Sequence, residues 1–356
     1  MRFVTLSNCK PNMILARDVI TPTGDILIRS GHALRETYIQ NLINLGYAGV
    51  YIEDDLTKIN IEPETISQTL RSDSVKTAHD IFSRIQSLDA TQSNIMLDKI
   101  SAILDNILEQ ILKNPSQVTN IYSLKSFDQH LYQHSVDVTI LSILIGTELN
   151  LTTSEINTLG KAAFFHDIGK MVLNPDIINK TEQLSKEEFE EIKKHTLYGH
   201  QVLKDKLNME PDIYESALYH HECYDGTGYP MGLVGSTIPL FSRIIAVANA
   251  YDAMTTSRPY RSALLPSDVY EYILSCSGAQ FDPDVVKAFL NKVAPFAVGT
   301  TVMLSDGRKA VVLSNNPGAM LRPTVHIVRE TASDPELTIN LALDKGAEGI
   351  SIFDTF

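Results

Sequence analysis

Two short segments contain the residues whose types and spacing could do chemistry. His166 and Asp167 are adjacent and are soon followed by Lys170, and a second segment opens with the pair His220 and His221. One carboxylate and several imidazoles can bind divalent cations, because these donors suit iron, manganese and zinc. The lysine adds a positive charge beside them. The pattern therefore indicates a metal centre that acts on a phosphate group.

Further candidate ligands lie outside these two segments. His134, His195 and Asn249 fall on or at the ends of segments with helical periodicity, so a helix bundle could bring them into one cavity. His130 precedes His134 by four residues, which places both rings on one face of a helix. The pair His79–Asp80 has no such partners and is expected to be a solvated helix face. A bridging carboxylate with several imidazoles can hold two metal ions about 3.5–4 Å apart.

Composition narrows the classes of protein and of partner. The 356 residues, of which 44% are hydrophobic and 21% charged, predict a globular protein of two or three domains. No apolar run is long enough to span a bilayer, and the start lacks the features of a signal peptide. The three cysteines are few and far apart, so we expect a cytoplasmic protein. The lack of a long apolar run predicts no membrane partner. The net charge of −13 argues against DNA or RNA as a partner.

The first part of the chain predicts a small domain and a linker. Residues 1–55 combine short apolar runs, a turn and one amphipathic helix, which predicts a small α+β domain with a regulatory or a purely packing role. Residues 56–119 are expected to form a helical linker. Within it, residues 95–112 carry one apolar stripe, which predicts a helix that packs inside the chain or, alternatively, forms a homodimer.

The remainder predicts a helical domain and a short β-rich end. Residues 120–292 show helical periodicity, with capping boxes predicted at Thr152 and Ser185. Residues 293–356 alternate apolar runs with turn residues, which predicts a small subdomain built on a β-hairpin. The expected fold class is therefore mainly α.

The helical segment, from about residue 125 to 292, resembles the HD-GYP subgroup of the HD phosphohydrolases, bacterial enzymes that hydrolyse cyclic di-GMP. His166–Lys170 matches the HD-x-G-K element of the family, and His220–Pro230 matches HHExxDGxGYP throughout. Ala246–Thr255 and Arg258–Arg261 match a later block except at one residue. The resemblance implies that the catalytic domain, residues 120–292, is an HD-type helical bundle.

The resemblance also implies a role for individual residues. Asp167 would bridge two metal ions and act in catalysis with Lys170, which would sit beside the bound phosphate. Asn249 stands where the family has a metal-binding Asp; its carbonyl oxygen can still bind a cation but brings no charge. His130 could help to hold a third ion. The implied metal ligands are His134, His166, Asp167, His195, His220, His221, Asn249 and His130. The implied substrate contacts are Lys170, Asp225, Gly228, Tyr229, Pro230, Asp252, Arg258 and Arg261.

The implied function is metal-dependent hydrolysis of a cyclic dinucleotide, with cyclic di-GMP first, to linear pGpG and onward to GMP by a metal-bridged hydroxide. The cofactors would be two divalent ions, or three with His130, and iron or manganese is expected. Asn249 favours an alternative, a catalytically weak or inactive receptor that signals through its N-terminal domain. The Gly228–Pro230 segment disfavours a general nucleotidase. The residues do not separate cyclic di-GMP from cyclic GMP-AMP or cyclic di-AMP.

Overall fold

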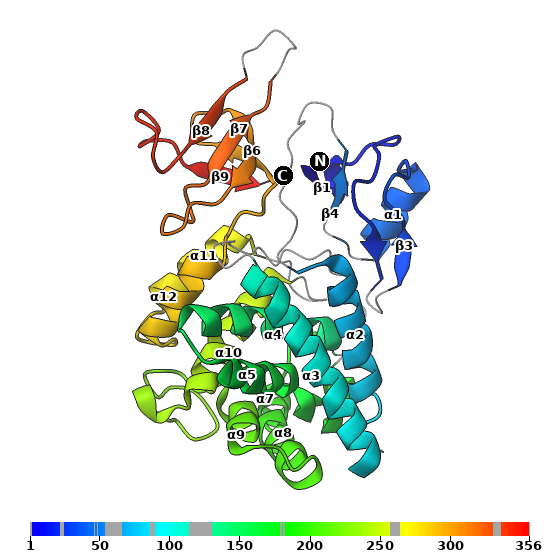
Figure 1. Ribbon diagram of the computed structural model, residues 1–356, viewed down its shortest axis with the longest axis vertical. Coiled ribbons are helices and arrows are strands. Elements are labelled where there is room, and N and C mark those ends of the chain that lie inside the picture. The colour runs from blue at the N-terminus through cyan, green and yellow to red at the C-terminus, as the bar shows by residue number, and fades with distance from the viewer. Residues whose placement is uncertain are drawn as a thin grey trace.

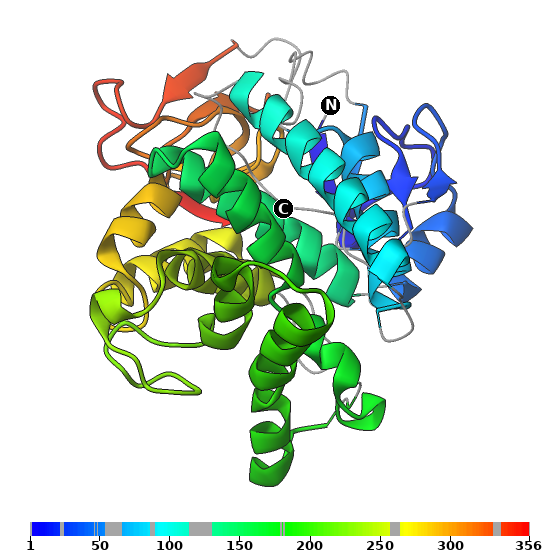
Figure 2. The same cartoon turned by 60° about the horizontal axis from the view of Figure 1, so that its bottom comes forward.

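Helices form the main body of the protein, and two small sheets and a larger one lie toward its ends. In the computed structural model (Figure 1), the N-terminal unit and the C-terminal sheet are neighbours above the helical body, and β1 contacts β5. The turned view in Figure 2 shows the green helices of the central region extending away from both units. The mainly α fold class is confirmed. The structure describes residues 2–21, 25–45, 47, 49–53, 66–85, 90–113, 130–178, 180, 182–256, 264–329 and 336–355.

The N-terminal unit has two short antiparallel strand pairs and one helix around its own core. β1 (Arg2–Thr5) pairs with β4 (Gly49–Ile52), and β2 (Val19–Ile20) pairs with β3 (Ile26–Ile28). A 3-10 turn, η1 (Leu6–Asn8), follows β1, and α1 (Glu36–Asn44) precedes β4. The apolar residues of this unit form a core separate from that of the helical body. Its buried members include Val4, Leu15, Leu34, Leu42 and Val50.

Two helices connect this unit to the central bundle. They are α2 (Gln68–Phe82) and α3 (Ala90–Lys113), and α3 packs on α2, α4 and α5. The stripe of α3 is buried inside the chain through Ile100, Leu104, Ile107, Leu108 and Ile111. The stripe therefore packs intramolecularly, and the homodimer through residues 95–112 stays a prediction that this face does not support.

Helix α2 also reaches the segments that carry the candidate ligands. The buried Phe82 of α2 packs edge-on against Phe164 and stacks on Phe165. Phe165 is the residue directly before His166 in the sequence. The His79 ring meets the edge of Tyr132, with the ring centroids 5.0 Å apart. The His79–Asp80 pair faces solvent as expected, with side chains 40% and 72% exposed, although Tyr132 of α4 contacts the His79 ring.

The bundle is built around α4 (His130–Glu148), which contacts α2, α5, α10 and α12. Every residue from Ser135 to Gly146 is buried. A helix that is buried all round belongs at the centre of a bundle, since it has no solvent face. The predicted capping boxes at Thr152 and Ser185 are confirmed and start α5 and α7.

The other elements of the bundle follow in chain order around α4. None of the helices in the described part of the chain has the length and apolar character that crossing a bilayer requires. The elements are α5 (Thr153–Phe165), η2 (Ile168–Val172), α6 (Pro175–Ile178), α7 (Lys186–Lys193), α8 (His195–Gln201), η3 (Val202–Lys206), α9 (Pro211–Tyr219), η4 (Gly235–Thr237), α10 (Leu240–Thr255), α11 (Pro266–Ser275) and α12 (Pro283–Lys292).

The C-terminal part is a five-stranded antiparallel sheet in the order β8-β7-β6-β5-β9. The predicted hairpin is present, with Gly307 at a positive φ between its two strands. The sheet goes beyond the expected hairpin, because β7 pairs with β6, β8 pairs with β7, and β9 returns to pair with β5. The strands are β5 (Thr301–Leu304), β6 (Lys309–Ser314), β7 (Thr324–Ile327), β8 (Thr338–Asn340) and β9 (Ile352–Thr355).

Candidate metal centre

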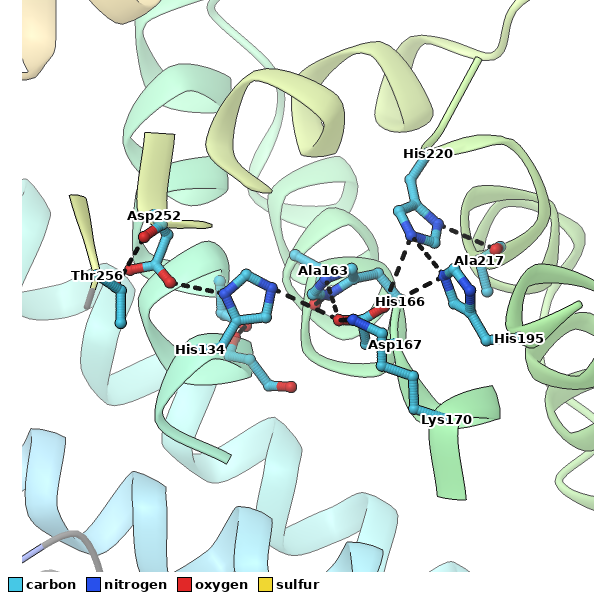
Figure 3. A network of polar contacts seen from close by, with 12 residues as sticks. His134, Ala163, His166, Asp167, Lys170, His195, Ala217, His220, Asp252 and Thr256 are labelled. Carbon is cyan, nitrogen blue, oxygen red and sulfur yellow. Dashed lines mark hydrogen bonds and ion pairs between the residues drawn. The ribbon is translucent and has the colours of Figure 1, made fainter. Parts of the chain in front are cut away.

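Five imidazoles and one carboxylate converge from four parts of the bundle. Figure 3 labels all of them except His221. Helix α4 supplies His134, and the end of α5 supplies His166 followed by Asp167. Helix α8 begins with His195, and α9 ends at the pair His220–His221. The structure thus brings together ligands that lie far apart in the sequence.

The carboxylate of Asp167 lies between two groups of imidazoles. Its Oδ2 is 3.3 Å from His166 Nε2 and 3.5 Å from His134 Nε2. Its Oδ1 is 3.4 Å from His195 Nε2 and 3.7 Å from His220 Nε2. His221 belongs with the second group, and within each group the ligand atoms lie within 4.8 Å of one another. Each oxygen therefore faces one group, the arrangement that a bridging carboxylate requires.

The same atoms are suited to divalent cations. His166 Nε2 and Asp167 Oδ1 are buried and have no hydrogen-bond partner. Buried polar atoms without a partner are costly, so their presence calls for an explanation. Donors about 2.1 Å from one cation lie roughly 3.0–3.4 Å apart, close to the separations around Asp167. Imidazole and carboxylate donors at these spacings fit a pair of divalent metal ions.

Three of the imidazoles are oriented by the backbone of the preceding helical turn. A carbonyl oxygen can only accept, so each Nδ1 carries the proton and leaves Nε2 free to bind a metal. The bonds run from Nδ1 of His166 to Ala163 O (2.7 Å), of His195 to Ile192 O (2.7 Å) and of His220 to Ala217 O (3.0 Å).

His134 is oriented by a carboxylate instead. Its Nδ1 donates to Asp252 Oδ2 over 2.6 Å, and Asp252 is only 2% exposed. The hydroxyl of Thr256 donates to the backbone oxygen of Asp252. Figure 3 shows Asp252 behind His134, on the side away from Asp167. Asp252 was expected to contact substrate, which stays a prediction; sequence reasoning missed its hydrogen bond to the candidate metal ligand His134.

The electrostatics of the site favour the neutral form of four imidazoles, those of His134, His195, His220 and His221, and the charged form of the carboxylate. Burial lowers the pKa of His195 to about 3 and that of His220 to about 4, and it also lowers the pKa of His134 and His221. Burial alone would raise the pKa of Asp167, but Lys170 and His166 outweigh it and hold that pKa well below its usual range. Both states are the ones that metal binding requires.

Lys170 lies directly beside the candidate bridging carboxylate. Its Nζ donates to Asp167 Oδ2 over 2.5 Å, and its side chain is 25% exposed while Asp167 is fully buried. The ammonium therefore lies at the edge of the site, where it can meet an anion. The preceding Gly169 allows η2 to pack closely against the start of α8, because a Cβ at this position would lie 1.9 Å from the backbone oxygen of His195.

The loop after His221 is closed by a residue that sequence reasoning left without a role. Glu222 is 3% exposed and accepts hydrogen bonds from the backbone N–H groups of Met231, Gly232 and Leu233 at 2.7, 3.2 and 3.0 Å. A Cβ at Gly228 would lie 2.2 Å from Cys223 N, so only glycine fits there. The one available signal was an acidic residue directly after two candidate ligands.

Other residues expected at the site are Asp225, Asn249, His130, Arg258 and Arg261. Asp225 is exposed and accepts from the backbone N–H and hydroxyl of Thr227, which closes a local turn. Asn249 is half-buried on α10, one turn before Asp252. The side chain of His130, and Arg258 and Arg261 altogether, lie outside the described residues. Their roles stay predictions.

The chain is similar to known proteins in both sequence and fold. A family model described as "HD domain" matches residues 118–285. A cyclic di-GMP phosphodiesterase of Pseudomonas aeruginosa is 33% identical over 259 residues, which cover 72% of this chain and 61% of that protein. One of Thermotoga maritima is 34% identical over 199 residues, 55% of this chain and 53% of that protein. The chain therefore spans little more than half the length of these relatives.

Two further similarities concern the substrate class and the fold. A 3'3'-cGAMP-specific phosphodiesterase of Vibrio cholerae is 31% identical over 217 residues, which cover 61% of this chain and 44% of that protein. The solved structure of Bd1817, described as an HDG"Y"P protein of Bdellovibrio bacteriovorus, has a TM-score of 0.51 at 17% identity. It covers 81% of this chain and 97% of its own. Residues 118–285 therefore match the HD domain family, and the chain is similar to relatives that are named as cyclic dinucleotide phosphodiesterases.

Proposed function

We propose that this chain is a phosphodiesterase that hydrolyses a cyclic dinucleotide, with cyclic di-GMP as the first substrate to test, and that it uses two divalent metal ions. The observation that carries the proposal is the position of Asp167, which presents one oxygen to each of two imidazole groups. The curated relatives named as cyclic di-GMP and cGAMP phosphodiesterases support the substrate class.

Some residues of the site would bind the metal ions, and Lys170 would bind the phosphate of the substrate. His134 and His166 would hold one ion and His195, His220 and His221 the other, with Asp167 shared between them. When bound, divalent cations lower the pKa of water and withdraw charge from phosphoryl oxygens. Lys170 would pair with a phosphate oxygen of the substrate, since its ammonium is partly exposed beside Asp167. Iron or manganese suits the mixed imidazole and carboxylate donors.

The charge of the chain makes these local cations important. A net charge of −13 repels a dianionic dinucleotide at long range. Binding therefore depends on short-range contacts with the ions and Lys170, and we propose Arg258 and Arg261 as further contacts.

A test of the activity begins with protein purified without oxygen and with its metal content counted. The iron-loaded and manganese-loaded forms are then given cyclic di-GMP and, in parallel, cyclic GMP-AMP, and the products are separated by chromatography. Release of linear pGpG or GMP is expected, and Asp167→Asn is expected to abolish it. Binding without any linear product in either metal form would overturn the proposal.

A receptor is the second candidate function, and the residue that favours it is Asn249. An amide oxygen brings no charge to a cation, so an ion held near α10 would be bound less firmly than by a carboxylate. The variant Asn249→Asp separates the two candidates. A receptor that lacks only this carboxylate gains turnover in the variant, whereas the proposed enzyme already turns over with Asn249 in place.

A further inference from the structure

His221 differs from the other candidate ligands in how its ring is oriented. The other four imidazoles each donate a hydrogen bond from Nδ1, to a backbone carbonyl or to Asp252. Within the described part of the chain, the side chain of His221 has no hydrogen bond. Its ring lies instead almost parallel to that of Tyr229, at 16° and with the centroids 4.8 Å apart. Something other than a hydrogen bond must therefore fix this ring.

Tyr229 is itself held from two directions. Its backbone N–H donates to the carbonyl oxygen of His221 over 3.2 Å, so the two residues are joined through the main chain as well as through their rings. The ammonium of Lys193 lies 5.3 Å from the centre of the Tyr229 ring and 5.0 Å from that of Phe189. It also donates to Glu190 over 2.6 Å. Lys193 thus connects α7 to the Gly-Tyr-Pro segment.

We propose that Tyr229 is a positioning residue, which fixes the ring of His221 for metal binding, and that Lys193 keeps Tyr229 in place. This inference rests on the proposed metal-dependent function. Stacking sets the plane of the His221 ring, as the Nδ1 hydrogen bonds set the planes of the others. A cation over the face of Tyr229 is attracted to its π electrons and so favours the same ring position. Tyr229 then acts through a ligand, in contrast to the direct substrate contact expected from the sequence.

The experiment measures Mn²⁺ binding to the metal-free chain, with the signal of free Mn²⁺ followed by electron paramagnetic resonance. Tyr229→Phe keeps the ring and should keep the affinity. Tyr229→Leu removes the aromatic face and should weaken the ion held with His221 by about 10- to 100-fold, the usual effect of losing a group that orients a ligand. Lys193→Met should weaken it by a smaller factor, on the order of threefold.

Lys194→Met is the matched control for Lys193→Met. Lys194 is the next residue and forms the same kind of ion pair, with Glu191 at 2.6 Å. The Lys194→Met substitution should leave Mn²⁺ binding unchanged. Because Lys193 is partly exposed, this comparison stands even if Tyr229→Leu fails to fold. Wild-type affinity in both Tyr229→Leu and Lys193→Met, with a raised KM for the dinucleotide, would overturn the inference. If the wild-type chain itself binds no Mn²⁺, the proposed function fails first.

Discussion

The contact between Asp252 and His134 gives the sharpest quantitative prediction. The two atoms are 2.6 Å apart, and the side chains are 2% and 11% exposed, so water screens the contact little. A hydrogen bond to a charged group contributes about 1.5–3 kcal/mol. Asp252→Ala removes the acceptor and leaves the imidazole N–H without its partner. We expect the affinity for the ion held by His134 and His166 to fall about 100-fold.

The assay is a titration of the metal-free chain with Mn²⁺ by calorimetry, with the stoichiometry read at a limiting metal concentration. Wild type should bind two ions, and Asp252→Ala should bind one tightly and one weakly. Asp252→Asn keeps an oxygen that can accept from His134, so a fall of about tenfold is expected. Thr256→Val is the control, because it removes the neighbouring hydrogen bond from the Thr256 hydroxyl to the backbone oxygen of Asp252 and keeps the carboxylate. Two tight ions in Asp252→Ala, together with a raised KM, would refute the positioning role and restore the substrate contact.

Three further predictions follow from the site. Glu222→Ala should lower the free energy of unfolding by about 2–4 kcal/mol in urea titrations, because three backbone N–H groups lose a charged acceptor, and Glu222→Gln should cost less. Gly169→Ala should disrupt metal binding, since the added Cβ would lie 1.9 Å from a backbone oxygen. Gly349→Ala is the control and should not, because its added Cβ would have no atom within 4 Å. Equal metal content in the two variants would contradict this prediction. The metal-free chain should lose stability as the pH falls below about 6.5. The imidazoles of the unfolded chain bind protons there, while His195 and His220 in the folded chain do not until about pH 3 and pH 4. A thermal unfolding midpoint that rises on acidification would contradict this prediction.

The sequence was enough to predict the donors of the site, because their types and local spacing carry the signal. His166 and Asp167 are adjacent, and so are His220 and His221, so their types and spacing marked them as candidate ligands, and the resemblance to the HD-GYP subgroup implied the full set. The capping boxes were predictable for the same reason, since each involves residues three positions apart. Local rules of this kind do not depend on the rest of the fold.

The groups that support the donors could not be predicted in this way. Asp252 reaches His134 across 118 residues, and nothing in the spacing of the two shows that their helices meet. The return of β9 to β5 is likewise a pairing between distant segments. Contacts of this range depend on how the elements pack, which local patterns do not encode.

The most direct test of the central claim is the paramagnetic resonance spectrum of the manganese-loaded chain. We expect two ions per chain that share Asp167, at the separation of about 3.5–4 Å typical of two-metal sites, and therefore a spin-coupled spectrum. The Asp167→Asn variant should lose that coupling. A single ion per chain, or two ions with the six-line spectrum of isolated Mn²⁺, would contradict a shared carboxylate at the centre of the site.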